Sequence, residues 1–203
     1  MLETLLSIDR DLFLFLNTQF SNPILDFFFV TITEARFWII PAFLGAAFFI
    51  GFQRKKALIV IGLALITVAL TDPIAARIIK PLAGRLRPCH PDVFIEGGNF
   101  LLGLKKSFSF PSSHSMNIFA QATLLSCFYP RKSIWFFAFA STIGFSRIYV
   151  GVHYPGDVIF GALFGIIIAC GVLYGFRFVI MFKGRKRSGV PEENSLPGEV
   201  KNG

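Results

Sequence analysis

Five stretches of the chain contain no aspartate, glutamate, lysine or arginine and are rich in leucine, isoleucine, phenylalanine, alanine and glycine. They cover residues 37–52, 57–71, 111–130, 134–146 and 158–176. With flanking residues, most of them reach or nearly reach the roughly 20 residues that an α-helix needs to cross a bilayer. A helix satisfies its own backbone hydrogen bonds in lipid, whereas a lone strand does not. The pattern therefore predicts an all-α, polytopic bundle with five transmembrane helices.

The N-terminal region departs from this pattern. Two short apolar runs lie within residues 11–34, and neither is long enough to cross a bilayer. The residues that separate them are polar or break helices: Asn17, Gln19, Asn22 and Pro23. We interpret the two runs as interfacial or re-entrant helices, with a sixth span as the alternative. Asp9 or Ser7 is a candidate N-cap for the first helix, because a short polar side chain can accept a bond from the free amides there.

The composition indicates that lipid is the solvent for much of the surface. Of the 203 residues, 54% are hydrophobic and only 16% are charged, and the mean hydropathy is +0.63. A soluble domain has about 25% charged residues, so this chain has too few polar residues to cover one core in water. We predict interfacial helices at 1–36, a transmembrane bundle at 37–182, and a basic and then disordered cytoplasmic tail at 183–203.

Small residues within the apolar stretches suggest how the helices pack. Gly161 and Gly165 form a small-xxx-small pair, which allows close approach between helices. Cys127 and Cys170 lie in apolar runs and are expected to be packing residues, whereas Cys89 stands alone in a polar loop. The chain has no CxxC pair, so neither a zinc site nor an intrachain disulfide framework is predicted.

The formal net charge of +8 is distributed unevenly along the chain. Short, purely basic segments at 54–56, 131–132 and 183–187 alternate with the spans, and five spans place all three on one side. By the positive-inside rule that side is cytoplasmic. Segments 72–113 and 147–157 lie on the other side and also carry basic residues, but mixed with acids or grouped together, which suggests an anion site. No basic helix or aromatic-basic platform indicates a nucleic-acid partner.

The first group of unusual residues follows the second span. Lys80 comes at its end, Pro81 is expected to terminate the helix, and Arg87 and Pro88 follow in the loop. Two explanations are open for these cations. They can bind an anion, or they can extend along the membrane surface toward lipid headgroups, as lysine and arginine at span ends often do.

A second group, Phe-Pro-Ser-Ser-His at 110–114, comes directly before an apolar helix. Ser112 or Ser113 is a good N-cap. A helix N-terminus with free amides is also an anion site. His114, in the first turn, could donate or accept a proton beside a bound phosphate.

The third group begins with Ser146 and Arg147 and ends with His153 and Asp157. Arginine presents a planar fork of donors that suits phosphate oxygens. We expect Asp157 to cap the last span and to turn back toward His153. A carboxylate that binds one imidazole nitrogen fixes the tautomer and leaves the other nitrogen free for attack or proton transfer.

Together the three groups predict a site for phosphoryl transfer, in which positioning and charge stabilisation do most of the work. The expected phosphate ligands are Lys80, Arg87, Ser112, Ser113 and Arg147. His153 is the expected nucleophile, and His114 the group that protonates the leaving oxygen. No cluster of acidic residues is present to hold a metal, so we predict that no metal or other cofactor is used and that the fixed cations take its place.

These residues resemble the signatures of the type 2 phosphatidic acid phosphatase superfamily, which read K-x6-R-P, P-S-G-H and S-R-x5-H-x3-D. The first matches at Lys80, Arg87 and Pro88. The third matches completely between Ser146 and Asp157. The second reads P-S-S-H, with serine at position 113 where glycine is usual. Order and spacing agree throughout residues 80–157.

The resemblance implies a six-helix-type bundle and metal-independent hydrolysis through a phosphohistidine on His153. It also implies that His114 is the general acid and Asp157 the partner of His153. Similar bacterial proteins include undecaprenyl-diphosphate, phosphatidylglycerophosphate and lipid A phosphatases, whose sites generally face the periplasm. We therefore predict a lipid phosphatase of the inner (cytoplasmic) membrane, with its site facing the periplasm or cell exterior. The expected substrate is undecaprenyl diphosphate or a related envelope lipid, and the alternative is lipid A or phosphatidylglycerophosphate.

Two other functions are compatible with this set of residues. A small transporter or scaffold could bind lipid phosphate without turnover, but it would not need His114 or the pair formed by His153 and Asp157. Vanadate-dependent haloperoxidases resemble this site too, but they are large soluble proteins. Phosphatase activity with and without a chelator distinguishes the three.

Overall fold

The computed structural model describes residues 2–187, and the side chains of residues 3–182. Within this range the chain forms helices and loops and no strand, which confirms the all-α prediction. The predicted disorder of 188–203 lies outside the described residues. The helices are α1 (Leu2–Thr18), α2 (Pro23–Thr33), α3 (Arg36–Pro73), a π-helical segment (Ile74–Ile79), α4 (Lys80–Ala83), α5 (Ser113–Phe128), a 3₁₀ turn (Pro130–Lys132), α6 (Ser133–Tyr149) and α7 (Pro155–Arg187).

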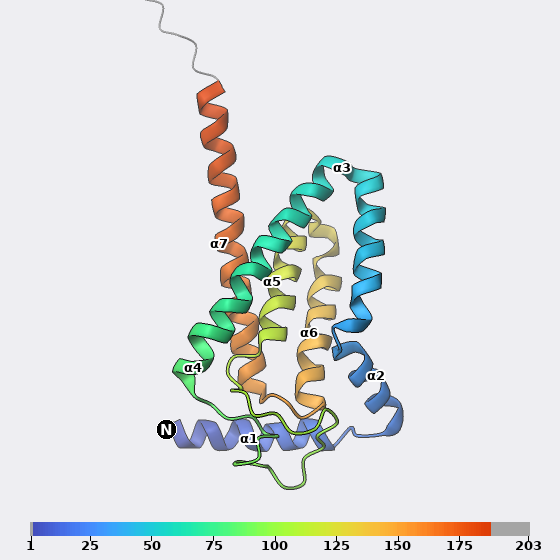
Figure 1. The fold of residues 1–203 in the computed structure, drawn as a ribbon, viewed down its shortest axis with the longest axis vertical. Coiled ribbons are helices and arrows are strands. Elements are labelled where there is room, and N and C mark those ends of the chain that lie inside the picture. Colours follow the sequence, from blue (N-terminus) through green and yellow to red (C-terminus); the bar gives the residue numbers. More distant parts are fainter. Residues whose placement is uncertain (1, 188–203) are drawn as a thin grey trace, which may run out of the picture.

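Helix α5 lies at the centre of the bundle and packs against α7, α6 and α3 (Figure 1). Its packing against α7 is very close. A Cβ on Gly161 would lie 2.6 Å from Ser112 O, and one on Gly165 would overlap Met116 O. The close approach predicted for these glycines is therefore confirmed. It holds the N-terminal end of α5 against the beginning of α7, where the second and third motifs lie.

Helix α3 reverses direction about halfway along its length. Gln53 has non-helical angles (φ −137°, ψ 51°), and the chain turns back on itself there, so that 37–52 and 57–71 form two separate arms (Figure 1). The second arm continues through the π-helical segment into α4. It ends at Gly84, whose positive φ of 58° suits glycine, and not at Pro81 as predicted. Pro81 is tolerated because it lies in the first turn of α4, where its missing N–H is not needed.

The five predicted spans are not confirmed as a set. Two helical stretches in the described range are long and apolar enough to cross a bilayer, Arg36–Ala83 with 48 residues and Pro155–Phe182 with 28. Helices α5 and α6 have 16 and 17 residues. At 1.5 Å per residue each is about 25 Å long, which is shorter than a hydrocarbon core of about 30 Å. The number of spans therefore stays a prediction.

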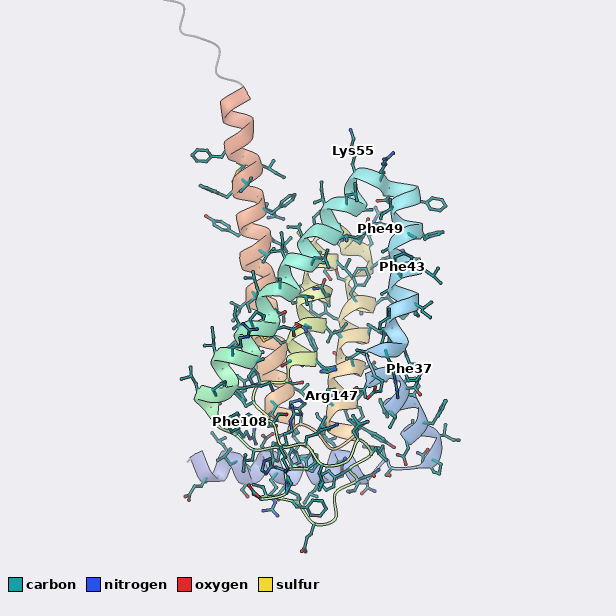
Figure 2. The ribbon with its side chains drawn as sticks, in the orientation of Figure 1. Phe37, Phe43, Phe49, Lys55, Phe108 and Arg147 are labelled. Atoms are coloured by element: carbon teal, nitrogen blue, oxygen red, sulfur yellow. The ribbon has the colours of Figure 1, made fainter. Side chains whose placement is uncertain are left out.

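The outer surface of the bundle is nevertheless strongly apolar. Only 28% of the most hydrophobic window of each long helix is buried, unlike the core helix of a soluble protein. Phe43 and Trp135 are 74% and 73% exposed, and Figure 2 shows Phe37 and Phe43 along the first arm of α3. Cys127 and Cys170 are exposed too, so their predicted packing role is wrong. They belong to the outward surface because their helices bury another face.

The N-terminal helices differ from the rest in direction. Helix α1 lies across the end of the bundle (Figure 1), an orientation expected of a helix in the membrane interface. Asn17 fastens it, since Nδ2 donates to Tyr149 O (2.7 Å) and Oδ1 accepts from Asn99 N (2.6 Å). Because α1 already begins at Leu2, Asp9 lies inside it and the predicted cap is wrong. The division into regions 1–36, 37–182 and 183–203 stays a prediction.

Candidate active site

The motif residues meet at the end of the bundle that α1 covers. The loop between α4 and α5 and the short α6–α7 connection both lie there. Figure 2 shows Arg147 and Phe108 near this end and Lys55 at the opposite one. Residues widely separated in sequence therefore share one site.

His153 and Asp157 form its buried centre. The Nδ1 atom of His153 lies 3.3 Å from Oδ2 of Asp157, and the two side chains are 2% and 0% exposed. Pro155 begins α7, and Asp157, two residues later, accepts a bond from Tyr154 N (2.9 Å). Asp157 thus reaches back from the third helical position to the cap residue's amide and is not itself the N-cap. Its contact with Nδ1 leaves Nε2 of His153 directed to the other side.

The Nε2 nitrogen of His153 faces a cation. Arg87 NH1 lies 3.0 Å from His153 Nε2 and donates to Val152 O (2.9 Å), while Arg87 Nε donates to Ser107 O (3.1 Å). Burial lowers the pKa of His153 to about 3, because loss of solvent around the imidazolium outweighs its attraction to Asp157. The imidazole is therefore neutral near pH 7, which is the form that can attack phosphorus.

Lys80 lies beside the segment that precedes α5. Its ammonium donates to three carbonyls, Phe108 O (3.2 Å), Ser109 O (3.2 Å) and Pro111 O (2.8 Å). These three bonds match the three donors of an ammonium group. Lys80 thus holds this segment in place and contributes positive charge, and it does not extend away from the protein toward headgroups.

Arg147 carries an unfilled donor. Its side chain is 8% exposed, and NH1 donates to Thr33 Oγ1 (2.6 Å). Ser146 Oγ also donates to Thr33 Oγ1 (2.9 Å), which ties the end of α6 to α2. The Nε atom of Arg147 is buried and has no hydrogen-bond partner among the described residues. Buried donors are rarely left unpaired in proteins, so this atom indicates a place for an anionic acceptor.

At the start of α5 the two serines differ. Ser112 is the N-cap, with its Oγ accepting from Ser115 N (3.4 Å) and its own amide donating to Asp157 O (3.0 Å). Ser113 and His114 instead line a cavity of about 500 Å³. His114 is exposed to this space, within electrostatic reach of all three motif cations.

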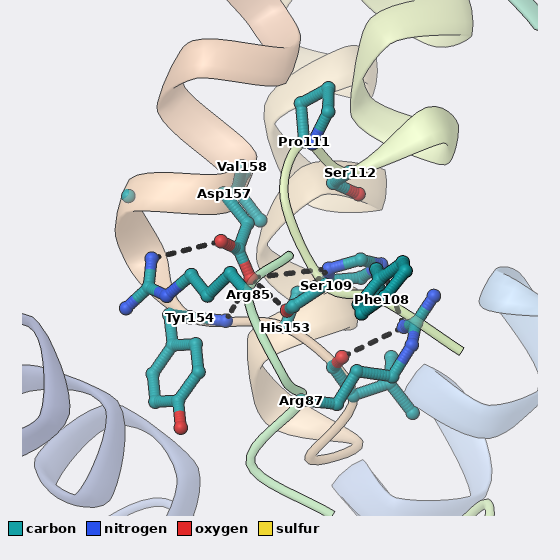
Figure 3. Close-up of polar contacts among 12 residues, drawn as sticks. Arg85, Arg87, Phe108, Ser109, Pro111, Ser112, His153, Tyr154, Asp157 and Val158 are labelled. Atoms are coloured by element: carbon teal, nitrogen blue, oxygen red, sulfur yellow. Dashed lines mark hydrogen bonds and ion pairs between the residues drawn. The ribbon is translucent and has the colours of Figure 1, made fainter. Parts of the chain in front are cut away.

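Four contacts of the site were not predicted. Arg85 binds Asp157 Oδ1 (2.9 Å), and its guanidinium lies 4.0 Å from the centre of the Tyr154 ring (Figure 3). Arg85 also binds Asp9 Oδ2 (2.6 Å). Ser109 donates to Asp157 Oδ2. Arg85 could have been proposed from the sequence, because it lies only two residues before Arg87. No feature of the sequence links Asp9 to the site, because its partners lie far away in the chain.

Within the described residues no three histidine, cysteine, aspartate or glutamate side chains come together in a way that could hold a metal ion. The arrangement instead offers a neutral imidazole, a second histidine and three cations. Such a set can attack a phosphoryl group and stabilise the charge that develops. Metal independence itself stays a prediction.

Comparison with known proteins supports this chemistry. The family profile of the PAP2 superfamily matches residues 57–180. Lipid A 4'-phosphatase of Bacteroides thetaiotaomicron is 33% identical over 81% of this chain and 75% of its own length. The same enzyme of Porphyromonas gingivalis is 32% identical over 82% and 72%. The crystal structure of Aquifex aeolicus LpxE superposes with a TM-score of 0.62 at 30% identity, covering 81% of this chain and 93% of that one.

The predicted substrate, undecaprenyl diphosphate, has a more limited counterpart. Undecaprenyl-diphosphatase of Sulfolobus acidocaldarius is 31% identical over 56% of this chain and 53% of its own length. The family match, which covers more than half of the sequence, and the lipid A 4'-phosphatases together show that this chain belongs to the PAP2 superfamily, a family of lipid phosphatases.

Proposed function

We propose that this protein removes a phosphate monoester from a lipid A-type glycolipid of the cell envelope, through a phosphohistidine on His153. The lipid A 4'-phosphatases support the glycolipid, since each matches about four fifths of the chain. They favour this alternative over undecaprenyl diphosphate. The observation that carries the chemistry is the orientation of His153, with Nδ1 at Asp157 and Nε2 toward a cation.

The first step forms a bond between Nε2 of His153 and phosphorus. Asp157 accepts the Nδ1 proton in a hydrogen bond and stabilises the imidazolium that develops. The ester P–O bond breaks, and its oxygen takes a proton from the imidazolium of His114 as the lipid alcohol departs. The negative charge of the bound phosphate favours this protonated form of His114. His114 suits this task because it lines the cavity beside the site.

The cations stabilise the phosphoryl group during transfer. The unfilled Nε of Arg147 offers one donor at once. Arg87 NH1 donates to His153 Nε2, so phosphate oxygens would have to replace that bond and free the nitrogen for attack. Lys80 adds charge while keeping its carbonyl bonds. Fixed cations in a site shielded from water do not need to reorganise as the reaction proceeds.

The second step consumes water. His114, now neutral, takes a proton from the water molecule as its oxygen attacks phosphorus. The P–N bond breaks, the electron pair returns to His153, and inorganic phosphate leaves. His153 and His114 are then in their initial states.

The two ends of the bundle support a location for the site. Lys55 lies opposite the site (Figure 2), and Lys56 donates to Phe128 O (3.1 Å), so the basic segments 54–56 and 131–132 are neighbours. By the positive-inside rule this end is cytoplasmic. The site then faces the periplasm or cell exterior, where envelope glycolipids are accessible.

The test is phosphate release from purified lipid A by the full-length protein in detergent, with excess chelator. We expect release by the wild type and none by His153→Gln. His90→Gln is the matched control, since His90 is also a buried loop histidine but its side chain accepts a hydrogen bond from Asp92 N and none from the site residues. Turnover by His153→Gln, or a wild type inactive until a metal is added, would refute the mechanism.

A further inference from the structure

The cavity beside His114 is lined by two kinds of side chain. It lies between the α2–α3 junction, the second arm of α3, α5 and α6. Its apolar walls are Ile32, Ala35, Trp38, Ile118, Phe139 and Ile143. Its polar lining is Thr33, Asp72, Ser113, His114, Asn117 and Gln121. A purely hydrocarbon ligand would have no use for the polar set.

The polar residues form a track along α5. His114, Asn117 and Gln121 follow one another at helical spacings of three and four residues, so they share one face. At 1.5 Å per residue the track extends about 10 Å from the first to the last. It therefore leads from the proposed proton donor into the interior of an otherwise apolar bundle.

Asp72 stands opposite this track, on α3. Asn117 Nδ2 donates to Asp72 Oδ1 (2.7 Å), and Thr71 donates to Asn117 Oδ1, which orients the amide. No lysine, arginine or histidine forms an ion pair with Asp72 among residues 3–182. Asp72 comes directly after the apolar stretch 57–71, and its side chain is exposed where it lines the cavity. Here it is a positioned acceptor whose second oxygen has no partner in the described part of the protein.

The substrate's leaving group must face this acceptor. His114 protonates the leaving oxygen in the proposed function, and His114 lines the cavity. The carbon atoms attached to that oxygen therefore enter the cavity first and pass Asp72 before the hydrocarbon tails begin. A carboxylate only accepts hydrogen bonds, so those carbons should carry donors.

We propose that Asp72, oriented by Asn117, binds a hydroxyl or amide N–H that the substrate lipid carries within a few carbons of its phosphoester. The inference rests on the proposed function and narrows it to lipid phosphate monoesters with a free hydroxyl or amide N–H near the phosphoester, as in glycolipids and amide lipids. Phosphatidic acid has esterified oxygens at these positions and offers no donor. In a prenyl diphosphate the group next to the transferred phosphate is another phosphate, which the carboxylate repels.

Two lipids test this directly. Ceramide 1-phosphate and phosphatidic acid are both two-chain primary phosphate monoesters, but only the ceramide has an amide N–H and a hydroxyl near the phosphoester. We expect wild-type kcat/KM to favour ceramide 1-phosphate. Asp72→Asn should lower this value about 10-fold to 100-fold, the size of one hydrogen bond to a charged group, and leave phosphatidic acid nearly unchanged.

Controls separate this inference from the proposed function. Asp11→Asn makes the same charge change on the exposed face of α1 and should alter neither substrate. Asn117→Ala keeps the carboxylate but not its orienting donor, so ceramide 1-phosphate alone should fall, by less than in Asp72→Asn. Turnover of farnesyl diphosphate by Asp72→Asn should exceed that of the wild type, because the repulsion is removed.

Three results would overturn the inference: no lipid preference in the wild type, an equal fall on both lipids in Asp72→Asn, or an unchanged Asp72→Asn enzyme. An equal fall that extends to a water-soluble aryl phosphate would show that Asp72 only maintains structure. A wild type that releases no phosphate from lipid A would instead refute the proposed function.

Discussion

Arg85 NH1 lies 2.9 Å from Oδ1 of Asp157, on the side of the carboxylate opposite to His153. The NH2 atom of the same guanidinium lies 2.6 Å from Asp9 Oδ2, and Asp9 Oδ1 accepts from Gly156 N (2.7 Å). Helix α1 is thus joined through one arginine to the carboxylate that orients the proposed nucleophile. We assign Arg85 a positioning role.

Arg85→Met should lower kcat at least about 10-fold with a small change in KM, because Asp157 loses its fixed orientation while the phosphate ligands remain. Breaking a buried ion pair on one side leaves an uncompensated charge, so Tm should fall as well. Adding Asp9→Asn to Arg85→Met should recover part of the Tm, a coupling that a double-mutant cycle measures. Arg10→Met, on the exposed side of α1, is the control. If Arg85→Met lowered kcat and the affinity for inorganic phosphate equally, Arg85 would not act by positioning Asp157.

Arg147→Lys should lower kcat/KM about 10²-fold or more, since loss of one preorganised donor to a developing charge has this effect and a point charge does not replace a planar fork. Arg36→Lys is the matched control, because the Arg36 side chain is 73% exposed. Inhibition by inorganic phosphate should weaken in parallel with kcat/KM. Near-normal turnover in Arg147→Lys would mean that Arg147 only binds Thr33.

Much of the site could be predicted from sequence, because its ligands recur at short, regular spacings within three segments. Asp9 and Thr33 could not, since their partners are brought near only by the docking of α1 and α2. Asp157 was predicted to be the N-cap of α7. It is the third helical residue instead, because Pro155 takes the first helical position. The end of α4 was misplaced because Pro81 lies in the first turn of α4, where its missing N–H is tolerated.

The fold, too, could be predicted only in part from the sequence. The apolar stretches predicted helices correctly. Hydropathy alone does not show that 37–52 and 57–71 belong to one helix, α3, which turns back at Gln53. Nor does it reveal that α5 (Ser113–Phe128) is shorter than its charge-free segment 111–130, whereas α6 (Ser133–Tyr149) extends beyond 134–146 at both ends. Helix ends depend on local caps and on neighbouring elements, and hydropathy does not record these.

The two histidines should differ in a trapping experiment. With an aryl phosphate, whose leaving group needs little protonation, His114→Ala should still form phosphohistidine but should hydrolyse it slowly. His153→Ala should form none. Rapid-quench labelling with a radioactive aryl phosphate measures acid-labile phosphoenzyme in each. General acid catalysis is worth about 10²–10⁴-fold, so His114→Ala should lose far more activity on a lipid monoester. Labelled enzyme in His153→Ala but not in His114→Ala would reverse the two roles.

Stability should depend on pH through His153. Its pKa is lowered from about 6.5 to about 3 in the folded protein, so below pH 6.5 the unfolded chain binds a proton that the folded protein does not. His153 therefore stabilises the fold fully above pH 6.5 and progressively less as pH falls toward 3, by at most about 1.4 kcal/mol per pH unit. The fall in Tm in detergent between pH 7 and pH 4 should be smaller in His153→Gln than in the wild type. Equal falls would contradict the lowered pKa.

Membrane orientation can be read from cysteine labelling in intact cells. A cysteine in place of Asp92, whose side chain is 77% exposed, should react with an impermeant thiol reagent, whereas one in place of Lys132 should react only after lysis. Native Cys127 and Cys170 are exposed and are replaced first. Cys89 is buried, and desolvation raises its pKa, so it should react slowly. The reverse labelling pattern would put the site in the cytoplasm.

The close packing of Gly161 and Gly165 against α5 has a consequence for how such an enzyme can diversify. Helix α5 carries His114, and α7 begins two residues after His153, so the offset between these two helices determines the separation of the histidines. That offset is set by backbone contacts between the two helices, which do not depend on the length of the surface loops. Loops and cavity walls can therefore change to admit new headgroups while the reacting pair stays in register, and substrate range and chemistry can evolve independently on one scaffold.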